Sequence, residues 1–214
     1  MSGTLKTKIK AIDAEVMRLH YKWKHFKQVF GSDEKVKLLN EAAPVFFGYL
    51  WNIMLFDILL SIARLTDPPK SKVKSIIKEN LSFDNLVLEI NDANLQSRLT
   101  QQILALKEKM KAVKIWRDEK IAHNDLLRLM KEAPLPAIQV TEITDALALI
   151  RGIMNAFHQN FNLQTVWYEI CFEHDPGDGK SLMYHLKYGF DASREDFTKY
   201  DMRRDHEIIE WLKG

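Results

Sequence analysis

Apolar side chains recur at helical spacing through the first thirty residues, and this pattern constrains the fold more than any other feature of the sequence. The steps alternate between four and three, which places the side chains on one face of a helix. They are Leu5, Ile9, Ile12, Val16, Leu19, Trp23, Phe26 and Phe30. Gly31 is a natural stop and Ser32 a natural cap, so we predict helices over residues 4–30 and 33–40.

Scarce helix breakers extend this prediction to the rest of the chain. The 214 residues include only 8 glycines and 6 prolines, and no alternating apolar pattern indicates a sheet. The further helices that we expect cover residues 45–65, 71–78, 83–90, 92–130, 141–160 (or to 172) and 181–188. Their expected first-turn, capping and stop residues are Pro44, Ser82, Asp92 or Asn94, Thr141 and Gly189.

The expected fold class is therefore all-α: a bundle of about five main helices with a small helical C-terminal appendage. The loop over residues 173–180 is rich in Gly, Asp and Pro, which favours a boundary there. We predict a helical bundle over residues 1–172 and an appendage over residues 173–214.

Residues 45–65 are nearly all apolar, and their length is close to that of a membrane span. However, Asn52, Asp57, Ser61 and Arg64 interrupt the run, and charges at mid-span are expensive in lipid. A buried central helix is favoured over a membrane helix. Asp57, Ser61 and Arg64 form one polar line, so we expect them to bond to each other or to a neighbour.

Cysteine content and net charge bound the compartment and the partners. The single cysteine, Cys171, cannot form an intramolecular disulfide, and the first residues lack the apolar core of a signal peptide. We expect a cytoplasmic protein without a membrane partner. A net charge of +2 is too small to bind nucleic acid by bulk charge, so RNA contact would require local patches.

The strongest chemical signal lies in the helix expected over 92–130. Its apolar stripe consists of Leu95, Leu99, Ile103, Leu106, Met110 and Val113. Arg117 takes the next position on this stripe, followed by Ile121 and Asn124. A buried arginine requires a partner or an anion.

His123 follows Arg117 by six residues. On an ideal helix the two side chains would lie about 120° apart and about 9 Å along the axis. They do not share a face, but a second copy of the helix could supply the rest of a site. Glu119 lies one turn before His123, where it can orient the imidazole.

Residues 117–123, Arg-Asp-Glu-Lys-Ile-Ala-His, resemble the motif of HEPN ribonucleases, with Asp118 in the polar position after the arginine. The residues around the motif, Arg64-Leu65-Thr66-Asp67-Pro68, and Asn80-Leu81-Ser82 resemble the AbiU-type abortive-infection branch. The resemblance covers most of residues 10–165.

This resemblance implies a bundle that forms a homodimer, with two Arg–His pairs in one cleft. It also implies a metal-independent endoribonuclease without a cofactor that leaves a 2′,3′-cyclic phosphate. His123 would act as general acid or base, Arg117 would stabilise charge on the phosphate, and Asp118 would orient its neighbours. The supporting residues that we expect are Glu119, Asn124, Asp57 and Arg64.

The expected substrate is RNA such as tRNA or mRNA, in a bacterial defence or toxin system with an antitoxin as a further partner. Some HEPN toxins carry a tyrosine two positions after the histidine, where a partner enzyme modifies them; here Asp125 stands there, which argues against that mode. The alternatives are a non-catalytic module that binds RNA or protein, and a purely structural protein in which Arg117 forms an interface salt bridge.

Three other patterns favour ordinary structure over chemistry. Residues 177–181 end like a P-loop, but His174 stands where the first glycine belongs and no strand precedes it. Glu173, His174, Asp175 and Asp178 indicate an acidic turn rather than a metal site. The basic face of the first helix is more typical of a solvated surface than of an RNA contact; it carries Lys8, Arg18, Lys22, Lys24 and His25.

Overall fold

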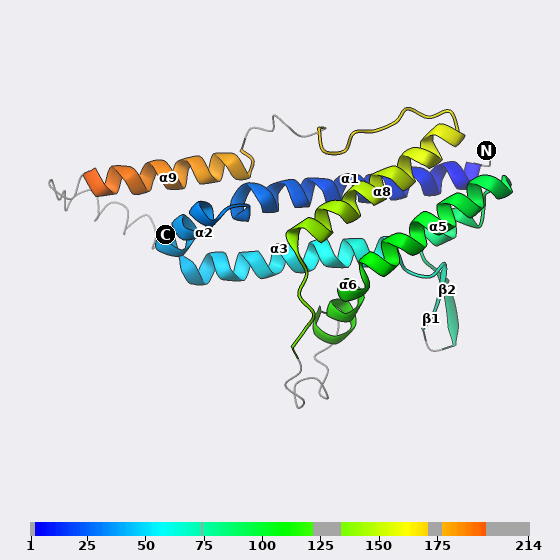
Figure 1. Cartoon of the computed structure of the whole chain (residues 1–214), viewed down its shortest axis with the longest axis horizontal. Coiled ribbons are helices and arrows are strands. Elements are labelled where there is room, and N and C mark those ends of the chain that lie inside the picture. Colours follow the sequence, from blue (N-terminus) through cyan, green and yellow to red (C-terminus); the bar gives the residue numbers. More distant parts are fainter. Residues whose placement is uncertain (1–2, 74, 122–133, 171–176, 196–214) are drawn as a thin grey trace.

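A computed structural model describes residues 3–73, 75–121, 134–170 and 177–195 (Figure 1). This part of the chain is mostly helical, as predicted. The two long helices α1 (Gly3–Phe30) and α3 (Pro44–Leu65) run side by side in opposite directions along the long axis of the molecule. The other helices pack around this pair.

The predicted stripe of the first helix is confirmed. Every member from Leu5 to Phe26 is at least 96% buried. Burial of each large apolar side chain stabilises the fold by about 1.5–3 kcal/mol. A Cβ at Gly31 would lie 2.2 Å from the backbone oxygen of Lys27, so the chain can leave α1 here only with glycine. Ser32 then caps α2 (Asp33–Ala42) by accepting from the amide of Lys35 at 3.4 Å.

Helix α3 begins with Pro44 in its first turn, as predicted, and is buried unevenly. Its C-terminal half lies in the core, whereas Val45, Phe46, Tyr49 and Ile53 in its N-terminal half are between 46% and 87% exposed. Among the described residues, α3 is the one helix long and apolar enough to span a membrane, and 33% of that apolar window is buried. The prediction of a buried central helix therefore holds for the second half of α3 only.

The prediction of a helix over residues 71–78 is wrong, and so is the expectation that the chain contains no sheet. This segment forms an antiparallel hairpin of β1 (Lys70–Val73) and β2 (Ile76–Glu79). Asn80 closes the base of the hairpin, because its side-chain nitrogen donates to the oxygen of Pro68 at 2.8 Å and its amide donates to Pro69 at 2.9 Å. All four residues of β2 are exposed, so the strands leave no alternating apolar pattern in the sequence.

One short helix and one long helix add to the bundle. Ser82 caps α4 (Phe83–Val87), which is shorter than predicted. Helix α8 (Val140–Asn160) begins one residue before the predicted Thr141, where the amide of Gln139 donates to Glu142 at 2.7 Å. It ends as predicted at Asn160 and does not continue to residue 172.

The chain beyond α8 is held on the bundle by a buried polar cluster. Tyr168 is fully buried, and its hydroxyl donates to Asp13 on α1. His158 of α8 lies 3.4 Å from the same carboxylate. Burial would raise the pKa of Asp13, but the bonds from His158 and Tyr168 outweigh it and hold that pKa below its ordinary value.

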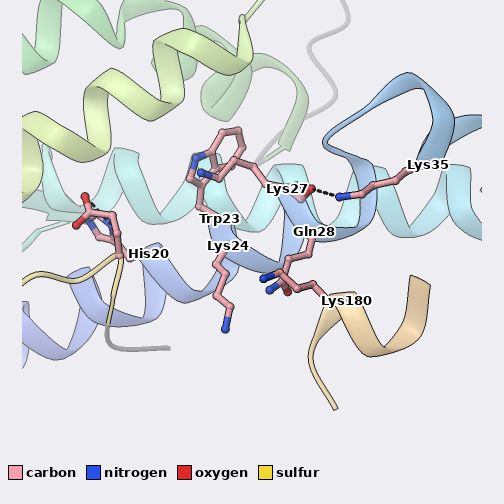
Figure 2. A pocket seen from close by; sticks show the side chains of 8 residues that line it. His20, Trp23, Lys24, Lys27, Gln28, Lys35 and Lys180 are labelled. Atoms are coloured by element: carbon pink, nitrogen blue, oxygen red, sulfur yellow. Dashed lines mark hydrogen bonds and ion pairs between the residues drawn. The ribbon is translucent and has the colours of Figure 1, made fainter. Parts of the chain in front are cut away.

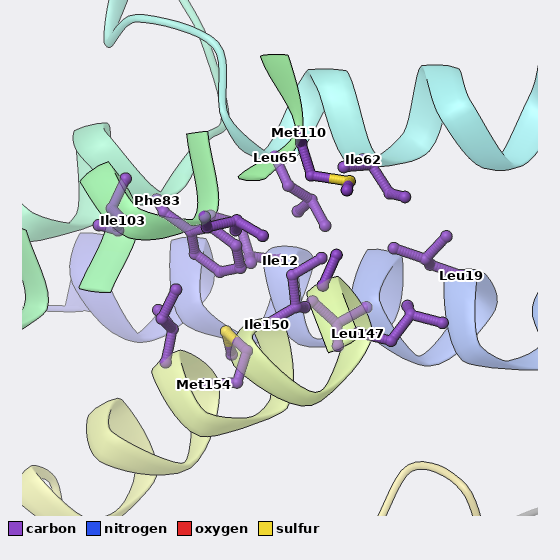
Figure 3. Close-up of a cluster of buried hydrophobic side chains, with 14 of the residues drawn as sticks. Ile12, Leu19, Ile62, Leu65, Phe83, Ile103, Met110, Leu147, Ile150 and Met154 are labelled. Carbon is purple, nitrogen blue, oxygen red and sulfur yellow. The ribbon is translucent and has the colours of Figure 1, made fainter. Parts of the chain in front are cut away.

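The main core lies between α1, α3, α4, α5 (Ala93–Lys109) and α8 (Figure 3). Ile12 and Leu19 of α1 face Ile150 and Leu147 of α8 in this cluster, and Phe83 joins them from α4. The short helix α6 (Lys111–Trp116) and the π-helical turn η1 (Arg117–Ile121) pack on α3 next to this core.

The last described helix, α9 (Gly179–Glu195), packs against α1 and α2. It passes through Gly189, where the sequence predicted a stop. Its Met183 joins a second, smaller core with Val29, Leu39 and Phe47. The domain boundary expected over residues 173–180 falls largely outside the described residues and stays a prediction.

Candidate active site

The stripe that leads to Arg117 is confirmed in the structure. Asp92 opens α5 by accepting from the amides of Asn94 and Leu95 at 2.9 and 3.2 Å. Each apolar member of the stripe from Leu95 to Val113 is at least 95% buried. Arg117 follows on the same side of the chain, with 23% of its side chain exposed.

The single helix predicted over residues 92–130 is interrupted. α5 ends at Lys109, α6 begins at Lys111, and Arg117 opens the π-helical turn η1. No glycine or proline marks these positions, so the sequence carries no breaker signal there. Single π-helical turns are rare and are frequent at functional sites.

Two carboxylates hold the guanidinium of Arg117. Its Nη1 lies 2.5 Å from Oδ1 of Asp67, and its Nε lies 2.7 Å from Oδ1 of Asp118. Burial alone would lower the pKa of Arg117, but the bonds from Asp118 and Asp67 outweigh it and raise that pKa above its ordinary value. Arg117 is therefore a permanent cation whose side chain is about three-quarters buried.

Trp116 fixes the turn that carries Arg117. Its indole nitrogen donates to the backbone oxygen of Pro136 at 2.8 Å, and its ring lies 5.9 Å from that of Phe56 on α3. These contacts tie η1 to α3 on one side and to the segment before α8 on the other. Because Arg117 directly follows Trp116, these contacts restrict where the backbone of Arg117 can lie.

A recess of about 330 Å³ opens beside Arg117 and Asp67. Lys107, Lys111 and Lys114 line it from α5 and α6. Lys107 is paired with Asp84 of α4, whereas Lys114 forms no ion pair within the part of the chain that the structure describes. Lys111 lies 3.9 Å from Glu108, so Lys114 and the partly exposed guanidinium of Arg117 are the cations here that suit a phosphodiester.

The predicted site residues are distributed as follows. Arg117 and Asp118 lie together, and Glu119 is half-buried on the same turn. His123 and Asn124 lie outside the described residues, as do Asp125, Cys171 and His174.

Asp57 and Arg64, predicted as supporting residues, have partners other than Arg117 among the described residues. Lys22 of α1 lies 2.8 Å from Asp57 and donates to Ser61 at 3.0 Å. The Nε of Arg64 donates to the backbone oxygen of Leu60 at 3.3 Å. Bonding of the polar line to a neighbour is thus confirmed, and the residue of this region that holds Arg117 is Asp67.

Asp67 is the residue that sequence reasoning missed. It follows the last turn of α3 in the Thr66-Asp67-Pro68-Pro69 stop, fifty positions before its partner. Asp67 lies within the segment that carries the family resemblance, but an acidic residue directly before two prolines also indicates a helix end.

The described residues contain no group of three or more side chains suited to hold a metal ion. Asp178 caps α9 by accepting from the amides of Lys180 and Ser181 at 3.0 and 3.3 Å, and it accepts from Gln28 at 2.6 Å. These bonds agree with the predicted acidic turn as far as this residue is concerned.

Comparison with known proteins gives one result. A family model described as AbiU2 (HEPN_AbiU2) matches residues 3–180. No curated protein and no solved structure matches the chain.

Proposed function

The chain belongs to the HEPN AbiU2 family, an abortive-infection family, and we propose that it is a metal-independent endoribonuclease of a bacterial defence or toxin system. HEPN domains are typically RNases. The substrate is RNA, with tRNA and mRNA as the first candidates, and an antitoxin is a further expected partner. The active site is composite and lies at the interface of a cytoplasmic homodimer.

One observation carries this proposal. Arg117 occupies the next position of an otherwise apolar stripe and lies beside a recess that three lysines line. Among these lysines, Lys107 is paired with Asp84 and Lys111 lies 3.9 Å from Glu108. Lys114 has no ion-pair partner among the described residues and is available, with Arg117, to an anionic ligand. A phosphodiester placed in the recess would contact the guanidinium and replace part of its bond to Asp67.

The proposed chemistry is a transesterification. The RNA 2′-oxygen attacks the adjacent phosphorus, the bond from phosphorus to the 5′-oxygen breaks, and a 2′,3′-cyclic phosphate forms. His123 takes the proton of the 2′-hydroxyl or gives one to the leaving 5′-oxygen. Arg117 stabilises the charge that develops on the phosphoryl oxygens, and Asp118 orients the guanidinium.

The exposed face of α3 supports the homodimer. Val45, Tyr49 and Ile53 follow one another at steps of four, and the same side of α3 continues to Phe56, which touches Trp116. An exposed apolar surface of this kind is typical of a protein interface. A second copy seated on this face would lie next to the turn that carries Arg117.

The test is cleavage of total tRNA by the purified chain in the presence of EDTA. We expect cleavage that ends in 2′,3′-cyclic phosphates and falls at least a hundredfold in Arg117→Ala and His123→Ala. Arg98→Ala and His185→Ala are matched controls, because both residues are exposed on α5 and α9 away from the recess. They should leave the rate unchanged.

Three outcomes would contradict the proposed nuclease activity. RNA bound without cleavage by the wild-type chain would favour the non-catalytic module. Cleavage that persists in both variants, or that chelation abolishes, would show that Arg117 and His123 do not carry it.

A further inference from the structure

A second cavity, of about 500 Å³, lies where α1 meets the start of α2, the segment before residue 170 and the start of α9 (Figure 2). Its volume falls within the range of small-molecule sites, about 300 to 1,000 Å³. The described residues that line it include four lysines, Lys24, Lys27, Lys35 and Lys180, and one carboxylate, Glu169. None of them belongs to the recess beside Arg117.

The acidic groups that the structure describes in the lining of this cavity or beside it are already engaged. Glu169 lies 2.7 Å from Arg151, and its bond to that arginine helps to hold the Glu169 pKa below its ordinary value against the opposite effect of burial. Asp178 lies 3.5 Å from Lys24 and bonds to the first turn of α9. Neither carboxylate is left to neutralise the remaining lysines.

Three ammonium groups thus remain without a carboxylate. Lys27, Lys35 and Lys180 form no ion pair within the described ranges, and the ammonium of Lys35 donates only to the backbone oxygen of Lys27, at 3.5 Å. They come from α1, α2 and α9 in turn, and Figure 2 shows Lys35 and Lys180 on the two neighbouring elements that flank α1. Three like charges around one cavity repel each other, and a bound polyanion would relieve that repulsion.

The aromatic group in the cavity wall is covered. Trp23 is 3% exposed, its ring stacks on Phe26 at 5.4 Å, and the ammonium of Lys27 lies 5.9 Å from the ring centroid. Among the described residues that line the cavity, a nucleobase would find no open aromatic face on which to stack. Recognition would therefore rest on phosphate groups, which lysine binds as a point charge with three donors.

We infer that this cavity binds a small molecule that carries two or more linked phosphate groups. Three ammonium groups from three separate elements match the charge of a diphosphate or triphosphate better than that of a single anion. This cavity, which residues of several elements line, suits a compact ligand better than a continuous RNA strand, whose backbone needs an extended groove. This site is independent of the proposed nuclease.

The test is isothermal titration of the full chain with inorganic tripolyphosphate at constant ionic strength. We expect saturable binding that Lys27→Gln, Lys35→Gln and Lys180→Gln each weaken about tenfold or more, since each removes charged hydrogen bonds. Lys10→Gln, Lys37→Gln and Lys187→Gln are matched controls on the same three helices. They should change the affinity less than twofold.

Two further arms identify the ligand class. Adenosine triphosphate should bind within about threefold of tripolyphosphate, because the one tryptophan in the described lining, Trp23, is covered. A twelve-nucleotide RNA should not compete for the site. NMR signals of the His20 ring in the cavity wall should shift on addition of tripolyphosphate, which gives a readout in the wild-type chain.

The inference fails if tripolyphosphate shows no saturable binding, or if the control variants weaken binding as much as the cavity variants. It also fails if RNA binds through these lysines while tripolyphosphate and the nucleotide do not. None of these outcomes bears on cleavage at Arg117, so the two proposals stand or fall separately.

Discussion

Arg117 and Asp67 form a tertiary contact between residues 50 positions apart, and both side chains are about three-quarters buried. Such pairs stabilise more than exposed ones, because water screens them less. We predict that Asp67→Asn and Arg117→Gln each lower the free energy of unfolding by about 1 kcal/mol. The double variant should lose less than the sum, with a coupling of at least about 0.5 kcal/mol by urea denaturation.

The control for this cycle is the exposed pair of Lys109 and Asp145, which is 2.7 Å long but joins α5 to α8 at the surface. Its double-mutant cycle should give a coupling near zero. Equal couplings for the two pairs would mean that Asp67 does not position Arg117 in solution.

The sequence predicted Arg117 and Asp118 but not the third member of the cluster. Arg117 was recognisable because a charged residue continues an apolar stripe, which is a local pattern. Asp67 was not, because its role depends on how η1 packs against the end of α3, and periodicity carries no information on that packing.

His20 is a second residue whose environment decides its chemistry. It is 4% exposed, and burial, aided by the positive charges of Arg151 and Lys27, lowers its pKa to about 4. It is therefore neutral at pH 7, so its approach to Glu169 at 3.8 Å is no ion pair.

A pH dependence of stability follows from this pKa. Below its ordinary pKa of 6.5, the unfolded chain binds a proton on this imidazole that the folded chain does not accept until about pH 4. The free energy of unfolding should therefore fall between pH 7 and pH 5, by about 2 kcal/mol from His20 alone. In urea denaturation His20→Gln should flatten this slope, whereas His185→Gln at the surface should not. An unchanged slope in His20→Gln would rule out the lowered pKa.

At the scale of elements, two glycines of α9 should respond to alanine in opposite directions. A Cβ at Gly179 would lie 2.9 Å from Cβ of Gln28 and 3.1 Å from Val29, so Gly179→Ala should loosen the docking of α9 on α1. A Cβ at Gly189 meets nothing within 4 Å, and Gly189→Ala should stabilise the helix by up to about 1 kcal/mol. Hydrogen exchange of the α9 amides measures both effects: protection should fall in Gly179→Ala and rise in Gly189→Ala. A change of protection in the same direction in both variants would contradict the docked position of α9.

Local chemistry explains which elements could be predicted. Pro44, Ser82 and Asp92 each act within one turn, so their positions at helix starts followed from residue type alone. The hairpin over residues 70–79 was missed because all four residues of β2 are exposed and Asn80 closes the base of the hairpin with its own bonds. The break at Met110 was missed because neither glycine nor proline stands there, so the residue types give no signal of it.

At the scale of the whole molecule, the exposed face of α3 should hold two copies together. We predict that Tyr49→Glu raises the dimer dissociation constant at least a hundredfold, because it buries an unpaired charge at the centre of the face. Tyr184→Glu is the matched control, since Tyr184 is similarly exposed on α9, at 66% against 68% for Tyr49. Sedimentation of both variants gives the comparison, and a Tyr49→Glu chain that dimerises like the wild type would exclude this interface.

The composite nature of the active site can be tested without further structural information. If one cleft collects Arg117 and His123 from both copies, a heterodimer of Arg117→Ala and His123→Ala still holds one guanidinium and one imidazole, each from a different chain. Mixing the two inactive variants should then restore RNA cleavage well above the sum of their separate rates. If each copy instead carries its own complete site, every site in the heterodimer lacks one of the two groups, and mixing restores nothing. Tyr49→Glu introduced into both variants should abolish the recovery, because the restored site exists only while two chains are in contact.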